Sequence, residues 1–242
     1  MNYKIRYLIQ PVLLLVFIVL FFSCTATRQV RTIGKGNKGM EVTLGGPFFT
    51  NLGPPLPMPN LYIGGRYGLL QDLDIAVHYN LTAPIIPGIP LDLITGVYWV
   101  PIQPGIRGQE GSPDKGWGAG GSFALQWVTD FKSGFALLPA FKLARGFRYK
   151  WINPFIGTSL GLNFYRPHDN TPFVQVNPFL GAEFIIKERA SLSLKCTFFD
   201  IAYNLYGSQV DWVYIVDNTE EDRKYGVFGI ALGFSWDFGK QK

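Results

Sequence analysis

The chain has 242 residues and a formal net charge of +5; 16% of its residues are charged, 16% are aromatic and 28 are glycine. Its positive charge is small, and the basic residues lie near turns and ends rather than in a stripe, which argues against a protein that binds nucleic acid. Frequent glycine, many aromatic residues and sparse charge are typical of an all-β chain in contact with a membrane rather than of a helical chain.

The N-terminus has the features of an export signal. Lys4 and Arg6 form a short basic region, and residues 8–22 form an apolar stretch with two interruptions. This stretch is short for a transmembrane helix, which needs about 20 apolar residues. We therefore predict a signal peptide over residues 1–23. Its removal takes away Lys4 and Arg6 and lowers the formal net charge from +5 to +3.

Residues 20–24, with the sequence LFFSC, resemble the lipobox of bacterial lipoproteins. The resemblance implies cleavage before Cys24 and acylation of its thiol and new amino group, with palmitate as a candidate acyl group. Each buried CH₂ of such a chain contributes about 0.8 kcal/mol to membrane attachment. The alternative is an ordinary signal peptide followed by a chance cysteine. Cys196 is the only other cysteine, so an acylated Cys24 would leave no disulfide within the chain.

Residues 24–36 are mostly polar and include two arginines, one lysine and two glycines. This composition predicts a flexible tether between a lipid anchor and the folded part of the protein. No second change of composition follows, so we predict a single domain over residues 37–242.

Short runs with a period of two residues recur through this domain. The clearest run is the last, in which large apolar residues occupy every even position from Phe228 to Phe238 and small or polar residues occupy the odd positions. Four other clear runs lie at 73–81, 152–164, 174–187 and 191–198, and noisier runs lie at about 37–45, 60–69, 91–101, 117–129 and 134–145. We predict ten strands, with eight as the alternative count.

The residues between the large apolar ones distinguish a membrane barrel from a soluble β-sandwich. The outer face of a soluble sandwich is usually rich in charged residues and threonine, whereas the second face here is mostly Gly, Ala, Ser and Asn. Small residues suit the interior of a narrow barrel. The apolar face would then contact lipid, where a Lys or Arg at the midplane costs roughly 2–4 kcal/mol. Because hydrocarbon cannot satisfy a strand edge, we predict a closed antiparallel up-and-down transmembrane β-barrel.

The connections between the runs partly support this topology. An even number of strands returns both termini to one side, and a lipidated N-terminus would make that side periplasmic. The short connections near 71–72 and 187–189 suit periplasmic turns, and the long ones at 46–59 and 207–224 suit external loops. Five prolines make 46–59 unsuitable for pairing as a strand. A long 102–116 segment and a short turn near 132–133 break the pattern, so either the strand count is wrong there or the barrel is irregular.

A family resemblance rests on two motifs in the second half of the chain. The sequence NPFIG at 153–157 recurs as NPFLG at 177–181, and PFIGTSLGLNF at 154–164 resembles the strand motif of small OmpA-like and opacity-type outer-membrane barrels. The ending GFSWDF resembles the aromatic-terminated strand that the outer-membrane assembly machinery recognises, with Phe234, Trp236 and Phe238 as its aromatic residues. The resemblance implies a protein of the cell outer membrane, with that machinery and outer-membrane lipids as partners. The sequence gives no indication of the oligomeric state.

The predicted lumen carries charges of both signs in similar number. Its ionisable residues are Glu41, Arg66, Asp74, His78, Lys142, Glu183, Lys195 and Asp237. Buried charges must be paired, and a barrel of eight to ten strands leaves an interior that side chains can fill. We therefore predict an ion-pair network that plugs the lumen, with a narrow path for ions or small solutes as the alternative.

No residue pattern points to catalysis, a cofactor or a metal. His78 lies on a predicted inward face and His168 in a loop, and the chain has no other histidine and no committed Ser-His-Asp order. Two isolated histidines and one free cysteine do not form a metal-ligand cluster. We predict a barrel lipoprotein with a structural or surface-interaction role, without enzymatic activity or cofactor. A lipid-modifying enzyme at the barrel rim and a soluble lipocalin-like lipoprotein are the less favoured alternatives.

Overall fold

The computed structural model describes residues 28–49, 56–57, 60–82, 91–103, 115–129, 135–162, 164, 173–187, 189–199 and 227–238. Its strands are β1 (Lys38–Phe49), β2 (Leu56–Pro57), β3 (Leu61–Gly68), β4 (Leu73–Asn80), β5 (Leu91–Ile102), β6 (Lys115–Thr129), β7 (Phe135–Tyr149), β8 (Ile152–Leu162), β9 (Val174–Lys187), β10 (Ala190–Phe199) and β11 (Val227–Asp237). Within these ranges, no helix is long and apolar enough to cross a membrane.

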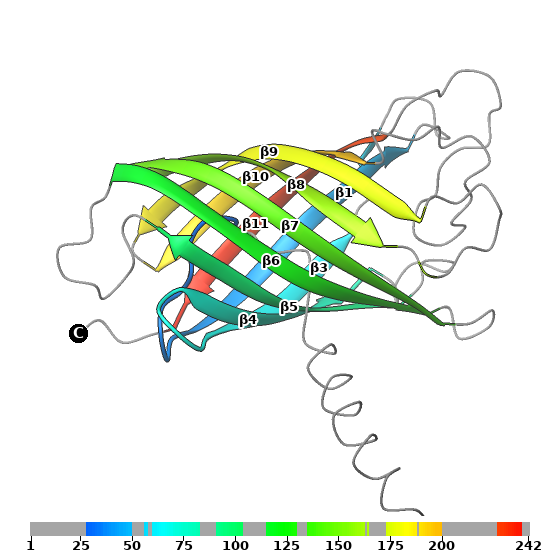
Figure 1. The fold of residues 1–242 in the computed structure, drawn as a ribbon, viewed down its shortest axis with the longest axis horizontal. Coiled ribbons are helices and arrows are strands. Elements are labelled where there is room, and N and C mark those ends of the chain that lie inside the picture. The colour runs from blue at the N-terminus through cyan, green and yellow to red at the C-terminus, as the bar shows by residue number, and fades with distance from the viewer. Residues whose placement is uncertain are drawn as a thin grey trace, which may run out of the picture.

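Ten of these strands form one closed antiparallel barrel. From β3 to β11 each strand pairs with the next along the chain, and β1 pairs with β3 on one side and β11 on the other. The closing pair runs from Gly39 opposite Asp237 to Pro47 opposite Gly229. Figure 1 shows the strands wrapping around a common axis at a steep tilt. The predicted closed barrel of about ten antiparallel strands is therefore confirmed.

The strand ends lie close to the predicted runs, with two exceptions. Strand β7 continues to Tyr149, beyond the predicted end at 145. In the 46–59 segment, β1 extends to Phe49 and pairs with β2, so that Phe48 lies opposite Pro57. The prediction that this segment does not pair is therefore wrong for these residues. A proline is compatible with so short a ribbon, because an edge position does not need its missing N–H.

The connections define two ends of the barrel. At the turn end lie the start of β1, the end of β11 and the connections 69–72, 103–114, 150–151 and 188–189. At the loop end lie the connections 50–60, 81–90, 130–134, 163–173 and 200–226. The long 103–114 connection thus belongs to the turn end and the short 130–134 connection to the loop end. The predicted strand count holds here, and the irregularity is in the connection lengths.

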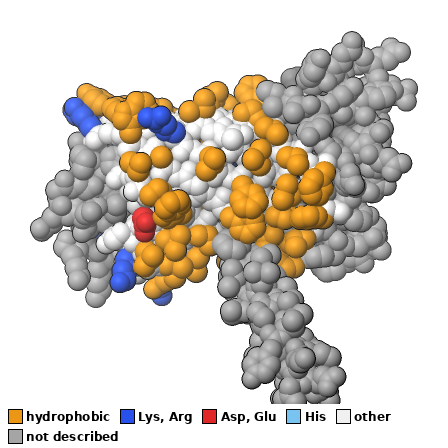
Figure 2. All heavy atoms as spheres, in the orientation of Figure 1, with side chains coloured by type: hydrophobic (Ala, Val, Ile, Leu, Met, Phe, Trp, Pro, Cys, Tyr) orange, Lys and Arg blue, Asp and Glu red, His pale blue; other side chains and the backbone are white. Residues whose placement is uncertain are grey.

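Most large apolar side chains of the clear runs face outward and most small or polar ones face inward, with Phe155 and Phe179 among the buried exceptions. In β11, Leu232 is 57% exposed, whereas Ser235 and Asp237 are each 1% exposed. Figure 2 shows hydrophobic side chains spread over the visible outer surface, with Lys and Arg gathered toward the turn end. The alternation in the sequence therefore separates the outer surface from the lumen.

Exposed aromatic residues gather at the two ends of the outer surface. At the turn end these are Tyr67, Trp99, Trp117, Tyr149, Trp151, Trp236 and Phe238, and at the loop end they are Phe164, Phe173, Phe198 and Phe228. Phe141, near the middle of β7, is an exposed aromatic residue between the two groups. Exposed aliphatic residues lie between the two belts, among them Leu143, Ile156, Leu180, Leu194 and Leu232. Arg145 faces outward near the turn end, with its guanidinium 4.6 Å from the centre of the Trp117 ring. Such an arrangement is typical of a surface that meets the two interfaces of a bilayer.

The repeated NPF(I/L)G motif locks β8 to β9. The register places Phe155 opposite Gly181 and Gly157 opposite Phe179, so each ring faces the glycine of the other copy. A Cβ at Gly157 would lie 2.5 Å from Cζ of Phe179, and one at Gly181 would lie 2.7 Å from Cζ of Phe155. The two rings meet edge to face with centroids 6.2 Å apart. The glycines are therefore needed because the opposing aromatic rings occupy the space of a side chain.

Candidate functional site

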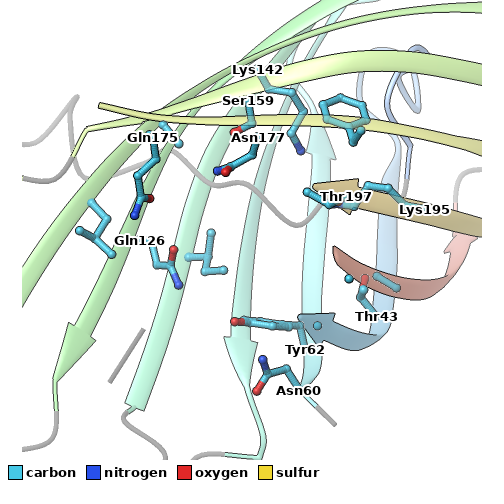
Figure 3. Close-up of a pocket in the computed structure, with 18 of the residues that line it drawn as sticks. Thr43, Asn60, Tyr62, Gln126, Lys142, Ser159, Gln175, Asn177, Lys195 and Thr197 are labelled. Carbon is cyan, nitrogen blue, oxygen red and sulfur yellow. The ribbon is translucent and has the colours of Figure 1, made fainter. Parts of the chain in front are cut away.

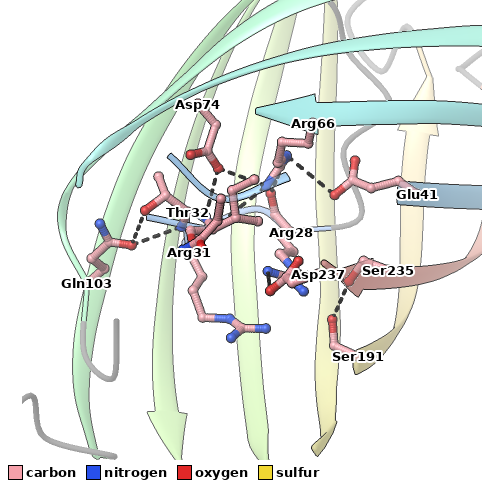
Figure 4. Close-up of polar contacts among 12 residues, drawn as sticks. Arg28, Arg31, Thr32, Glu41, Arg66, Asp74, Gln103, Ser191, Ser235 and Asp237 are labelled. Carbon is pink, nitrogen blue, oxygen red and sulfur yellow. Dashed lines mark hydrogen bonds and ion pairs between the residues drawn. The ribbon is translucent and has the colours of Figure 1, made fainter. Parts of the chain in front are cut away.

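The segment before β1 lies inside the barrel, at its turn end. Residues 28–34 are buried, and we refer to residues 28–37 as the plug segment. This placement differs from the predicted flexible tether over 24–36, of which 24–27 lie outside the described residues. The composition that indicates a tether is also that of a segment whose polar groups are paired within a polar lumen. Figure 4 shows its side chains among those of the barrel wall.

Arg28 binds the wall at the closing strands. Its Nη1 lies 2.8 Å from Oδ2 of Asp237, its Nε donates a hydrogen bond of 3.0 Å to Oγ of Ser235, and the same Nε lies 3.7 Å from Oε1 of Glu183. Burial alone would lower the pKa of the guanidinium, but the carboxylates of Asp237 and Glu183 outweigh it, so the pKa is raised above its ordinary value. Arg28 therefore remains charged inside the barrel.

Arg31 binds Glu183, which Arg28 also contacts. Its Nη2 lies 2.7 Å from Oε1 of Glu183, while Oε2 of Glu183 accepts a hydrogen bond of 3.4 Å from Nδ2 of Asn153. All of these groups are buried. Glu183 on β9 thus holds both arginines of the plug segment, and a charge-assisted contact of this length is among the stronger hydrogen bonds in proteins.

Arg66 on β3 connects the wall to the plug segment. Its Nε lies 3.4 Å from Oε1 of Glu41, and its Nη1 lies 3.5 Å from Oδ2 of Asp74. The guanidinium also donates to the backbone carbonyls of Arg31 and Arg28, at 3.4 and 3.5 Å. A single wall side chain therefore contacts two carboxylates and two plug carbonyls.

Backbone and hydroxyl contacts fix the middle of the plug segment. The N–H of Ile33 donates to Oδ2 of Asp74 at 2.9 Å, and that of Thr32 donates to Oε1 of Gln103 at 2.9 Å. The hydroxyl of Thr32 donates to the carbonyl of Gln71 at 2.6 Å. Buried backbone groups need such partners, and here the wall and the adjacent turns supply them.

An apolar contact also seats the segment against the wall formed by β7, β8 and β9. Val30 packs in a buried cluster with Ala144, Phe155 and Phe179. A Cβ at Gly118 would lie 3.4 Å from Cβ of Val30, so the wall glycine leaves the space that Val30 fills. The Phe–Gly lock between β8 and β9 therefore also forms part of the seat of the plug segment.

Two glycines turn the chain from the lumen into β1. Gly34 and Gly36 have φ values of +79° and +75°, a conformation that other residues rarely adopt. The N–H of Gly36 donates to the carbonyl of Gly68 at 2.8 Å, and the N–H of Gly68 donates to the carbonyl of Asn37 at 3.0 Å. The reversal is thus attached to the end of β3.

Charge explains why the wall accepts two arginines. Four carboxylates of the described wall lie in this cluster: Glu41, Asp74, Glu183 and Asp237. From the described wall, the guanidinium of Arg66 pairs with Glu41 and Asp74, and Nε2 of His78 lies 3.0 Å from Oε2 of Glu41. The plug segment adds Arg28 and Arg31. It therefore brings the positive charge that the acidic wall needs when water is excluded.

The comparisons with known proteins identify no family. No protein-family model matches the chain, and no curated protein matches it in sequence. Among solved structures, the N-terminal β-barrel domain of Pseudomonas aeruginosa OprF is similar with a TM-score of 0.33 and 11% identity, over 85% of this chain and 99% of that chain. The NanC porin is similar with a TM-score of 0.44 and 7% identity, over 83% and 98%. The strand pairing itself, and not these distant similarities, defines the barrel.

The loop-end side of the lumen contains a cavity of about 200 Å³. Lys142 on β7 and Lys195 on β10 line it, and their Nζ atoms lie 5.6 and 5.9 Å from the centre of the Phe179 ring. Hydroxyl and amide side chains line the remainder, including Ser159 and Asn177 (Figure 3). The turn-end part of the lumen is therefore acidic and occupied by the plug segment. The loop-end part is lined by two lysines and contains open space, which we refer to as the upper cavity.

The structure separates the predicted lumen residues into two groups. Glu41, Arg66, Asp74, His78, Glu183 and Asp237 are buried in the cluster around the plug segment, whereas Lys142 and Lys195 line the cavity. Of the three aromatic residues of the predicted assembly signal, Trp236 and Phe238 are exposed on the outer surface and Phe234 is half-buried. Cys24 and His168 lie outside the described residues. Within the described ranges, no group of three or more acidic, histidine or cysteine residues is arranged to hold a metal ion.

Arg28 and Arg31 are residues of the candidate site that the sequence interpretation missed. One signal could have revealed them: four of the predicted lumen residues near the turn end are acidic, and two arginines precede the first strand. The buried Asp92 was also missed. Its carboxylate accepts hydrogen bonds from the hydroxyl of Tyr62 and, at 2.8 Å, from Nε2 of Gln126.

Proposed function

We propose that the chain is an outer-membrane β-barrel whose own plug segment closes the lumen at the turn end, so that it serves a structural or surface-interaction role and not that of an open pore. The observation that carries this proposal is the seating of Arg28 and Arg31 on Glu183 and Asp237. Membrane location is supported by the exposed aliphatic band between two aromatic belts.

A lipid anchor at Cys24 fits this arrangement. Three residues separate Cys24 from the buried Arg28, and an extended chain spans at most about 3.6 Å per residue. An acylated Cys24 would therefore stay close to the turn end, which would then be periplasmic. Radiolabelled palmitate should be incorporated into the wild-type chain and into Cys196→Ala, but not into Cys24→Ala. Equal labelling of both variants would contradict the lipid anchor.

Conductance across a planar lipid bilayer tests the closed lumen. The wild-type barrel should show no discrete conductance steps, because the plug segment fills the turn end. Arg28→Ala combined with Arg31→Ala leaves Glu183 without the two guanidinium partners described above and should produce steps as the segment leaves the lumen. Lys35→Ala removes an exposed charge from the same segment and is the matched control. Steady conductance through the wild type, unaltered by the double variant, would contradict the proposal.

A narrow channel is the second candidate, and the cavity on the loop-end side favours it. It predicts conductance steps in the wild-type protein that change in size when Lys142 or Glu183 is replaced by glutamine. A lipid-modifying enzyme has less support, since His78 is buried against Glu41. We propose that the protein is not an enzyme, and lipid hydrolysis that His78→Ala or His168→Ala abolishes would contradict this.

A further inference from the structure

The upper cavity combines positive charge, hydrogen-bonding groups and an aromatic face. The register aligns Lys142, Ser159 and Asn177 in one row across β7, β8 and β9. Lys195 approaches from β10, and both ammonium groups lie near the ring of Phe179. Figure 3 shows the labelled side chains converging on the same space from different strands. This convergence is what a site for a small molecule requires.

The charged side chains that line the cavity are all basic. Of the described residues that line it, two are lysines and none is acidic. The nearby carboxylate of Asp92 accepts hydrogen bonds from Tyr62 and Gln126, which themselves line the cavity. Lys142 is almost completely buried. An anion in such a place interacts with the ammonium groups more strongly than it would in water, because the surroundings have a lower dielectric constant.

We propose that this cavity binds a small hydroxylated carboxylate. The carboxylate would lie between Lys142 and Lys195, its hydroxyl groups would bond to Ser159 and Asn177, and its C–H face would lie on the ring of Phe179. The volume of about 200 Å³ is below the roughly 300–1,000 Å³ of pockets for drug-sized ligands, which indicates a molecule the size of one sugar unit. The inference rests on the closed lumen of the proposed function, because a blind cavity retains a ligand whereas an open passage would release it at both ends.

Calorimetric titration of the folded barrel in detergent with sodium gluconate tests this inference. Gluconate carries one carboxylate and several hydroxyl groups, and glucose is its neutral counterpart. Gluconate should bind at least about tenfold more tightly than glucose, and Lys142→Gln with Lys195→Gln should weaken it by at least about tenfold, since a hydrogen bond to a charged group contributes that much. Inorganic phosphate should bind more weakly than gluconate, because it has no hydroxylated carbon chain for the ring and amides.

A control variant removes two lysine charges, as the cavity double variant does, but outside the cavity. Lys38→Gln with Lys115→Gln alters two exposed lysines at the turn end and should leave gluconate binding unchanged. Heat-modifiability on a gel verifies that each variant is a folded barrel. Absence of gluconate binding, equal binding by the cavity double variant, or phosphate binding as tight as gluconate would each overturn the inference.

Conductance measured on the same preparations separates the two proposals. A wild-type barrel that conducts steadily but binds gluconate through Lys142 and Lys195 would contradict the closed lumen alone. A wild-type barrel that shows no conductance and does not bind gluconate would contradict the ligand site alone.

Discussion

The buried charges around Arg28 are interdependent. Its guanidinium contacts Asp237 and Glu183, and neither carboxylate is accessible to water. Breaking a buried ion pair by removing one partner costs about 3–5 kcal/mol while the other charge stays buried. Removing both charges of such a pair costs much less, since no uncompensated charge is left behind.

Arg28→Met should therefore lower the denaturant midpoint of the folded barrel in detergent. The loss of stability cannot exceed the cost of releasing the plug segment, because release exposes the unpaired carboxylates to water. Adding Asp237→Asn to this variant should restore part of the midpoint, because it removes the unpaired carboxylate. Lys35→Met, at an exposed position of the same segment, should have an effect within about 0.5 kcal/mol. Tryptophan fluorescence measures the unfolding of each variant. Equal midpoints for Arg28→Met and Lys35→Met would show that the ion pair contributes nothing to stability.

At the scale of elements, the reciprocal contacts between β8 and β9 support both the wall and the plug segment. Each phenylalanine of the repeated motif occupies the space above the opposing glycine, and both rings belong to one buried cluster with Val30 and Ala144. Loss of either glycine should therefore disturb the strand pairing and the seat of the plug segment together.

Gly157→Ala and Gly181→Ala should each destabilise the barrel by about 1–3 kcal/mol, the usual cost of overpacking. The new Cβ would also lie 2.2 Å from a backbone carbonyl, that of Leu143 or Leu194, which cannot move without shifting a strand. At Gly65, the nearest atom to a new Cβ is the carbonyl oxygen of Gly39 at 3.9 Å, so Gly65→Ala should be neutral or slightly stabilising. Denaturant titration that finds the three variants equal would contradict the Phe–Gly lock.

The strands could be predicted from the sequence because one physical rule acts along each of them. Alternate residues of a strand face either the outside or the lumen. In the series from Phe228 to Phe238, every even position is large and apolar and every odd position is small or polar. The same alternation predicted that Glu41, Glu183 and Asp237 face the lumen, where the structure buries them.

The plug segment could not be predicted in this way. Residues 28–34 have no strand or helix period, and their position depends on groups far along the chain, such as Glu183 and Asp237. Alternation tells which side of the wall a charge faces but not which partner it meets. The short pairing of β1 with β2 was missed for a related reason, since proline disfavours a strand locally and only the completed hairpin brings Phe48 opposite Pro57.

For the whole molecule, the outer surface determines the environment that the barrel requires. Leu232 lies in the middle of β11, opposite Leu44 and Leu194, which are also exposed. Ile102 lies at the turn end of β5 and has the same exposed fraction, 57%. The two side chains differ in their position along the barrel axis and not in how much of them is exposed.

Leu232→Lys should therefore destabilise the barrel in lipid vesicles by roughly 2–4 kcal/mol, the cost of a lysine at the midplane of a bilayer. Ile102→Lys should cost about 0–1 kcal/mol, because a lysine near the interface can extend to water. Guanidinium titration in vesicles measures both. Equal and small effects would indicate that the outer surface does not meet lipid hydrocarbon.

A designed disulfide tests the closure of the lumen most directly. The Cβ of Val30 and a Cβ at Gly118 would lie 3.4 Å apart, close to the 3.5–4.5 Å of natural disulfides. In a Cys24→Ser, Cys196→Ser background, Val30→Cys with Gly118→Cys should cross-link on oxidation of the folded barrel and become unreactive to maleimide. Val30→Cys with Ser159→Cys, which joins the plug segment to the upper cavity, should not. Two thiols of the first pair that stay free and reactive in the folded barrel would contradict a lumen closed by residues 28–34.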